Sequence, residues 1–157
     1  MVSIIVLFLD LDGVLNTDGF RGFYGSNRVD PFLVENLAYI VFKTNCKIVI
    51  SSSWRFNMDE VFSALQCDAF QYRPQQVLID HVINSIIGST LDTGSRTEEI
   101  LGWVEFPPDG VIIDNWVAVD DLDLDLPPEH FVLTSDESGL QLDKANEIIS
   151  KLNKGNI

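Results

Sequence analysis

The sequence has few basic residues for its number of acidic ones. It contains 10 lysines and arginines against 24 aspartates and glutamates in 157 residues, which gives a net charge of −14 at pH 7. A chain with this balance has no broad basic surface with which to displace counterions. General binding to nucleic acid or to anionic membranes is therefore not expected, and part of the acidity is available for a metal site.

Cysteine is also scarce, and the hydrophobic run near the N-terminus is short. Cys46 and Cys67 stand in no metal or redox spacing, so we expect two buried thiols in a reducing compartment. The apolar run of residues 4–9 is too short to span a membrane, and no basic segment precedes it. We therefore expect neither a signal peptide nor a membrane anchor, and a cytoplasmic location.

Length and composition favour one folded domain over residues 1–157. The chain is 46% hydrophobic and 22% charged, which is an ordinary balance for a globular protein. Its length allows a substantial core but leaves no room for a large second module.

The stretch that ends in Asp10, Asp12 and Gly13 is the most informative. Residues 4–9 suit a strand that is buried on both faces. Because side chains alternate along a strand, Asp10 and Asp12 start on the same side, and Gly13 allows a sharp turn. Two acids this close repel each other, so one must be neutral or a cation must lie between them. The alternative is a strand followed by an ordinary acidic turn.

Strand and helix patterns alternate along the rest of the chain. A helix is predicted from Pro31 to about Thr44 with Asp30 as its N-cap, and a strand follows at residues 46–52. This strand–helix–strand order indicates a parallel sheet. Further predictions are helices at residues 58–65, 93–106 and after Gly139, and strands at residues 77–79, 82–87, 111–113, 116–119 and 130–133.

Residues 16–30 predict a flap over the end of the first strand. They contain three glycines, whose spacing matches no phosphate-binding loop, with Phe20, Phe23 and Tyr24 between them. Glycine makes such a segment easy to move, and aromatic faces stack on substrates. We expect a mobile aromatic flap with Phe23 and Tyr24 as candidate substrate contacts.

Polar side chains follow three predicted strands. Asp10 and Asp12 follow the first, Ser51 to Ser53 the second, and Asp120 and Asp121 the strand at residues 116–119. In open parallel sheets, ligands bind at the carboxyl ends of the strands. Carboxylate oxygens without histidine or cysteine nearby favour Mg2+. The acids continue at Asp123 and Asp125, where a solvated loop is expected because the glycine and glutamate of a calcium loop are absent.

The segment from Asp10 to Val14 resembles the DxDGV signature of the haloacid dehalogenase (HAD) superfamily, whose members are mostly Mg2+-dependent phosphatases. Similarity to small HAD-like domains, some of them fused in RNA-repair proteins, extends over the chain through residues 52–55, 96–104, 120–121 and 133–140. The resemblance implies an α/β fold: a Rossmann-like three-layer sandwich with a central parallel sheet and a minimal cap.

The resemblance also implies roles for the acids. Asp10 would attack phosphorus and form an aspartyl-phosphate. Asp12 would protonate the leaving alkoxide, later activate water, and ligate Mg2+ through its backbone carbonyl. Asp10, Asp120 and Asp121 would supply metal-binding carboxylates, with Asp120 the stronger candidate of the last two.

Two further roles have less specific signals. Ser52 is our first choice for the phosphate-binding hydroxyl and Ser51 the second, while a serine-rich turn that caps a helix is the plain alternative. Arg96 best matches the basic residue of the third motif, with Arg55 and Arg73 as alternatives.

The sequence therefore predicts a Mg2+-dependent phosphatase that hydrolyses phosphomonoesters. Its partner would be a small phosphorylated substrate or an exposed phosphate terminus, because a minimal cap leaves the site open. The alternatives are a polynucleotide end-processing phosphatase and a non-catalytic HAD-like binding module. The charge of −14 argues against the first alternative, and the intact pair of Asp10 and Asp12 argues against the second.

Overall fold

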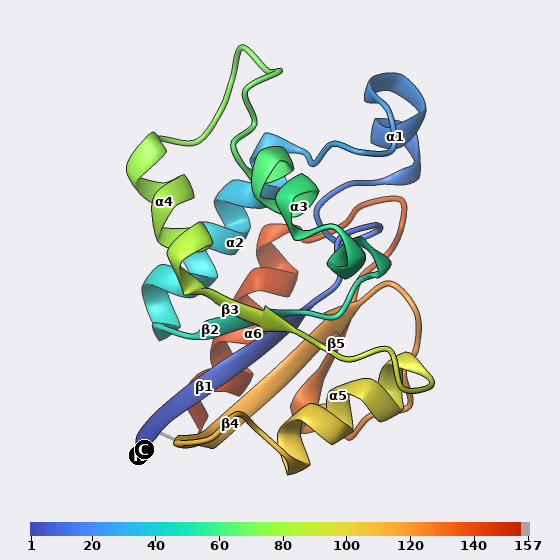
Figure 1. The fold of residues 1–157 in the computed structure, drawn as a ribbon. Coiled ribbons are helices and arrows are strands. Elements are labelled where there is room, and N and C mark those ends of the chain that lie inside the picture. The colour runs from blue at the N-terminus through green and yellow to red at the C-terminus, as the bar shows by residue number, and fades with distance from the viewer. Residues whose placement is uncertain (155–157) are drawn as a thin grey trace.

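The computed structural model describes residues 1–154, which form a parallel sheet between two layers of helices and loops (Figure 1). The sheet has five strands in the order β3-β2-β1-β4-β5, and all four pairings are parallel. The strands are β1 (Val2–Leu9), β2 (Lys47–Ile50), β3 (Ile86–Ser89), β4 (Val111–Asp120) and β5 (Phe131–Leu133). The predicted α/β sandwich is thus confirmed.

The helices divide unequally between the two faces of the sheet. One face packs against α2 (Pro31–Thr44), α3 (Met58–Leu65), α4 (Gln76–Ser85) and α6 (Leu142–Asn153), and the other face packs against α5 (Arg96–Glu105) and the loop after β4. β1 serves both layers, because Leu7 and Leu9 belong to the first core cluster and Val6 and Phe8 to the second. All four side chains are fully buried, as expected for a central parallel strand.

The pairing register decides which side chains meet at the carboxyl edge of the sheet. Leu9 of β1 is level with Ile50 of β2 and with Val119 of β4. The ladder continues beyond Leu9, since the Asp10 amide donates to the Val119 carbonyl and the Ser51 amide donates to the Leu9 carbonyl. The next residue of each strand therefore falls in one row, in which Asp10 stands between Ser51 and Asp120.

Local capping signals explain the two most predictable helices. Asp30 caps α2, where its carboxylate accepts a hydrogen bond from the Phe32 amide, and Pro31 is the first helical residue. Ser95 and Glu98 form a reciprocal capping box at the start of α5. This cap fixes the first turn of α5, which carries Arg96.

The prediction for residues 77–87 was wrong. The structure has the helix α4 there, followed by the edge strand β3, rather than two short strands. The buried residues of α4 are Ile79, Val82 and Ser85, a three-residue spacing that faces the core as one side of a helix. The two strands predicted within residues 111–119 are a single strand, β4, whose register with β1 shifts between Ile4 and Ile5.

The flap contains a short helix, α1 (Asp18–Tyr24), with Thr17 as its N-cap. Arg21 forms two 2.8 Å hydrogen bonds with the carboxylate of Asp136, and this ion pair joins α1 to the loop after β5. Phe20 and Tyr24 pack against Phe70, with ring centroids 5.6 and 5.1 Å away. These contacts join α1 to the body of the protein, and the mobility expected of the flap stays a prediction.

Among the described residues 1–154, no helix combines the length and the apolar character needed to cross a membrane.

Candidate active site

Three aspartates meet at the carboxyl edge of the sheet. Carboxylate oxygens of Asp10, Asp120 and Asp121 all lie within 4.8 Å of one another. Asp10 and Asp120 are 3% and 1% exposed, and Asp121 is half-buried. Asp10 directly follows β1, Asp120 is the last residue of β4 and Asp121 follows it, so the parallel register brings together acids that lie more than a hundred residues apart.

Arg96 is the arginine that the structure brings to this cluster. Its Nη1 lies 2.8 Å from Asp120 Oδ2 and 3.6 Å from Asp10 Oδ2. The two alternatives lie elsewhere: Arg55 pairs with Glu99, and Arg73 bonds to the Gln66 carbonyl. The choice of Arg96 for the third motif is thus consistent with its position.

One guanidinium does not balance three carboxylates, and the pKa values reflect this. Burial, followed by the negative charge of Asp120, raises the pKa of Asp10 from 3.8 to about 8 despite the opposing charge of Arg96. Burial also raises the pKa of Asp121, and its contacts with Asp120 raise that pKa further. Burial lowers the pKa of Arg96, but the charges of Asp10 and Asp120 more than offset this, so the guanidinium stays charged. A cation would relieve the repulsion.

The carboxylate of Asp12 faces a different set of groups. Its Oδ1 accepts a hydrogen bond from Asn16 Nδ2 at 3.0 Å, and its Oδ2 accepts one from the Trp54 indole Nε1 at 3.1 Å. Asp12 nevertheless lines the same hollow of about 200 Å³ as Asp10, Arg96 and Asp121. The structure thus holds Asp12 with neutral donors, beside the acidic cluster and outside it.

Gly13 allows Asp121 to approach the turn after β1. Its φ angle is +79°, and a Cβ atom at this position would lie 2.3 Å from Oδ2 of Asp121. The Gly13 carbonyl accepts a hydrogen bond from Thr134 Oγ1 at 2.8 Å, which fixes the turn from the β5 side. A side chain at residue 13 would displace the carboxylate from the cluster.

The serines after β2 have distinct surroundings. Ser51 stands beside Asp10 in the register, and its buried Oγ has no hydrogen-bond partner within residues 1–154. Ser52 is equally buried, but its Oγ accepts a hydrogen bond from the Trp54 amide and caps η1 (Ser53–Phe56). Ser53 lines the hollow. The unsatisfied hydroxyl beside Asp10 is therefore that of Ser51, the second choice from the sequence.

A buried ion pair joins the serine turn to α5. Both terminal nitrogens of Arg55 take part: Nη2 lies 3.0 and 3.1 Å from the two carboxylate oxygens of Glu99, and Nη1 donates to the Ser52 carbonyl. Glu99 also accepts a hydrogen bond from the Thr93 amide just before α5. The side chains of Arg55 and Glu99 are 8% and 3% exposed, so this pair holds Arg96 and the end of β2 in a fixed relation without touching the acidic cluster.

Asp123 and Asp125 point away from the cluster. Both are exposed, while Leu124 and Leu126 between and after them are buried in the second core cluster. The alternation of acid and leucine therefore reflects a loop with one side in solvent, as the sequence predicted.

Several residues of the site carried no sequence signal of their own. No role could be assigned to Asn16, Trp54 or Asp136 from the sequence, although residues 52–55 and 133–140 contribute to the resemblance. Each of the three acts through a partner that is distant in the sequence or across a turn. Arg21 also lines the hollow, and its ion pair with Asp136 becomes visible only in the structure.

The comparisons with known proteins agree with this fold. A family model described as the HAD domain in Swiss Army Knife RNA repair proteins matches residues 6–145, and the chain therefore belongs to this family. Membership confirms the predicted resemblance and places the chain among HAD-like hydrolases. Searches of curated proteins and of solved structures gave no match.

The donor set of the acidic cluster fits a hard divalent cation. All three side chains offer carboxylate oxygens, two of them are deeply buried, and neither histidine nor cysteine belongs to the group. Asp10, Asp120 and Asp121 could therefore hold a metal ion.

The raised pKa of Asp10 predicts that Asp10→Asn changes the stability of the metal-free protein by an amount that depends on pH. Because folding raises the pKa of Asp10 from 3.8 to about 8, the wild type should lose stability as the pH climbs through this range. Asparagine does not titrate. With a chelator present, the variant should therefore melt at a higher temperature than the wild type at about pH 8, with the difference vanishing near about pH 4. A difference that is equal at both pH values would contradict this account.

Proposed function

We propose that the protein is a Mg2+-dependent phosphatase that hydrolyses phosphomonoesters through an aspartyl-phosphate on Asp10. The observation that carries the proposal is the acidic cluster with Arg96 beside it, at the carboxyl edge of a parallel sheet in a HAD-family chain. Phosphoryl transfer needs a nucleophile, an acid, and positive charge beside the transferring oxygens. Each of these groups is present.

In the first step an oxygen of Asp10 forms a bond to phosphorus while the bond to the leaving alkoxide breaks. Asp12 gives its proton to that alkoxide. In the second step Asp12 takes a proton from water, whose oxygen attacks phosphorus and breaks the bond to Asp10. Inorganic phosphate leaves and both acids return to their starting state.

Arg96 and the metal would supply the positive charge. The guanidinium lies within 4 Å of Asp10 and binds phosphate oxygens as a planar fork. Asp10, Asp120, Asp121 and the Asp12 carbonyl would hold Mg2+, whose charge would offset that of the phosphate and lower its repulsion from the acids. The acids hold their places through the strand register and the turn at Gly13.

We assign the phosphate-binding hydroxyl to Ser51 rather than to Ser52. Ser51 is next to Asp10 in the strand register and its Oγ lacks a partner, whereas Ser52 is engaged in the cap of η1. A hydroxyl that is buried without a partner costs free energy, and a phosphate oxygen would satisfy it.

A polynucleotide end-processing phosphatase is the second candidate. The name of the matching family refers to RNA repair proteins, which favours a substrate with a phosphate terminus on RNA. The short flap leaves the hollow open to such a large substrate. The net charge of −14 opposes long-range attraction of RNA, so binding would depend on local contacts.

Hydrolysis of p-nitrophenyl phosphate, with and without Mg2+, tests the proposal. The wild type should release nitrophenol only with the metal, and Asp10→Asn should lose at least about a thousandfold in kcat because an amide is not a nucleophile. Its melting temperature at neutral pH should not fall. Near-normal turnover by Asp10→Asn would rule out the covalent mechanism, and no turnover by the wild type would favour a binding module.

The serine assignment has its own test. Ser51→Ala should raise KM or lower kcat for p-nitrophenyl phosphate by about tenfold, because one donor to the phosphate is lost. Ser52→Ala should instead reduce the free energy of unfolding by about 1 kcal/mol, because a cap is lost, and so lower the melting temperature. Its kcat/KM per folded molecule should change little. The reverse pattern would restore Ser52 as the phosphate ligand.

A further inference from the structure

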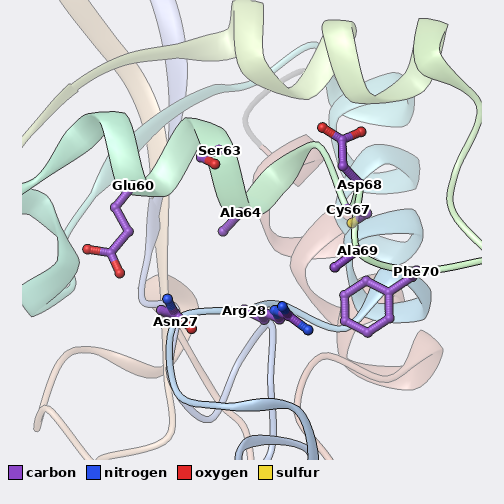
Figure 2. Close-up of a pocket in the computed structure, with 9 residues that line it drawn as sticks. All are labelled: Asn27, Arg28, Glu60, Ser63, Ala64, Cys67, Asp68, Ala69 and Phe70. Atoms are coloured by element: carbon purple, nitrogen blue, oxygen red, sulfur yellow. The ribbon is translucent and has the colours of Figure 1, made fainter.

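Two further hollows lie beside α3, and one of them adjoins the catalytic hollow that holds Asp10. A second hollow of about 310 Å³ is lined by Ser26, Asn27, Ser53, Trp54, Phe56, Asn57 and Glu60. It shares Ser53 with the catalytic hollow. A third hollow, also about 310 Å³, lies between residues 27–28 and α3 and shares Asn27 and Glu60 with the second (Figure 2). The second hollow therefore adjoins the one that holds Asp10 at Ser53, and the third adjoins the second at Asn27 and Glu60.

The chemistry sets the direction in which a leaving group would extend. The acid that protonates the leaving oxygen must lie on the leaving-group side of phosphorus. Asp12, the candidate acid, is bonded to the indole nitrogen of Trp54, and Trp54 lines the second hollow. The leaving group therefore extends past Asp12 into the second hollow, and away from α1.

The walls of the second hollow combine an aromatic face with uncharged polar groups. Phe56 is 67% exposed, and its ring is held by the guanidinium of Arg55, 4.5 Å from the ring centroid. Asn27 contributes an exposed side-chain amide, and Ser26 and Ser53 add hydroxyls. Glu60 is the one charged residue among the lining set, and no cation belongs to it. These walls fit a neutral heterocycle with hydroxyl groups, and they do not fit an anionic or an aliphatic group.

The aromatic residues of the flap do not line the second hollow. Tyr24 packs with Phe20 and Phe70 and lines a hollow that shares no residue with the second hollow or with the catalytic one, while Phe23 lines none of these hollows. The exposed aromatic residue on the leaving-group side is Phe56.

We propose that the second hollow is a leaving-group subsite for a nucleoside, with the base stacked on Phe56 and a ribose hydroxyl or base edge bonded to Asn27. The phosphate position rests on the proposed function, and the subsite adds to it a preference for nucleotides over other phosphomonoesters. Because stacking is tolerant of base identity, the subsite would accept any of the bases.

Binding to the inactive Asp10→Asn protein tests the subsite without catalysis. Titration calorimetry with MgCl2 present would compare adenosine 3′-monophosphate with glycerol 2-phosphate. Adding Phe56→Ala should weaken the nucleotide by about tenfold or more, the usual value of one stacked base, and leave glycerol 2-phosphate unchanged. Asn27→Ala should weaken the nucleotide by about threefold. Phe42→Ala is the matched control, since Phe42 is 69% exposed on α2 and lines none of the hollows described.

The outcomes separate the subsite from the proposed function. Equal weakening of both ligands by Phe56→Ala, no change for either, or no preference of the parent protein for the nucleotide would overturn the subsite. If the wild type hydrolyses p-nitrophenyl phosphate while the subsite test fails, the phosphatase proposal stands alone. If nucleotide binding depends on Phe56 but nothing is hydrolysed, the subsite stands and the catalytic proposal falls.

Discussion

The repulsion among three carboxylates is the constraint on which the site depends. Asp10, Asp120 and Asp121 share one end of the sheet with a single guanidinium, and two of them are almost completely buried. Burying uncompensated charge costs several kcal/mol per ion, so the surrounding fold must offset it. The buried second half of β1, from Val6 to Leu9, is paired on both sides and provides the rigid support. The same repulsion makes the cluster receptive to a cation.

Different contacts around the cluster hold different parts of the site in place. Arg55 and Glu99 fix α5, and therefore Arg96, relative to the end of β2, whereas Gly13 and Thr134 fix the turn that Asp121 approaches. Arg21 and the aromatic contacts of α1 fold the flap back onto the protein, which leaves the side toward Trp54 and Phe56 open. An open side next to Asp12 suits a substrate whose leaving group is larger than the phosphate that reacts.

The parts of the fold that the sequence predicted are those with strong local signals. The apolar run of β1, the Asp30 cap of α2 and the capping box of α5 each act within a few residues. α4 was missed because isoleucine and valine favour strands, and its helical face became clear only from its packing on the core. Within the site, the motif acids were found, but Trp54 and Asp136 act through Asp12 and Arg21, to which no local pattern links them. The choice between Ser51 and Ser52 could not draw on the pairing register, which only the structure supplies.

Direct titration of Mg2+ tests the central claim, that the buried acids are arranged for a cation. Calorimetry on metal-free wild-type protein should show one binding site, and Asp120→Asn should weaken it by about tenfold or more because a ligand is lost and the repulsion falls. Asp125→Asn removes the same charge from an exposed position and should bind Mg2+ as the wild type does. Equal affinity in the wild type and both variants, or no binding to the wild type, would contradict the account.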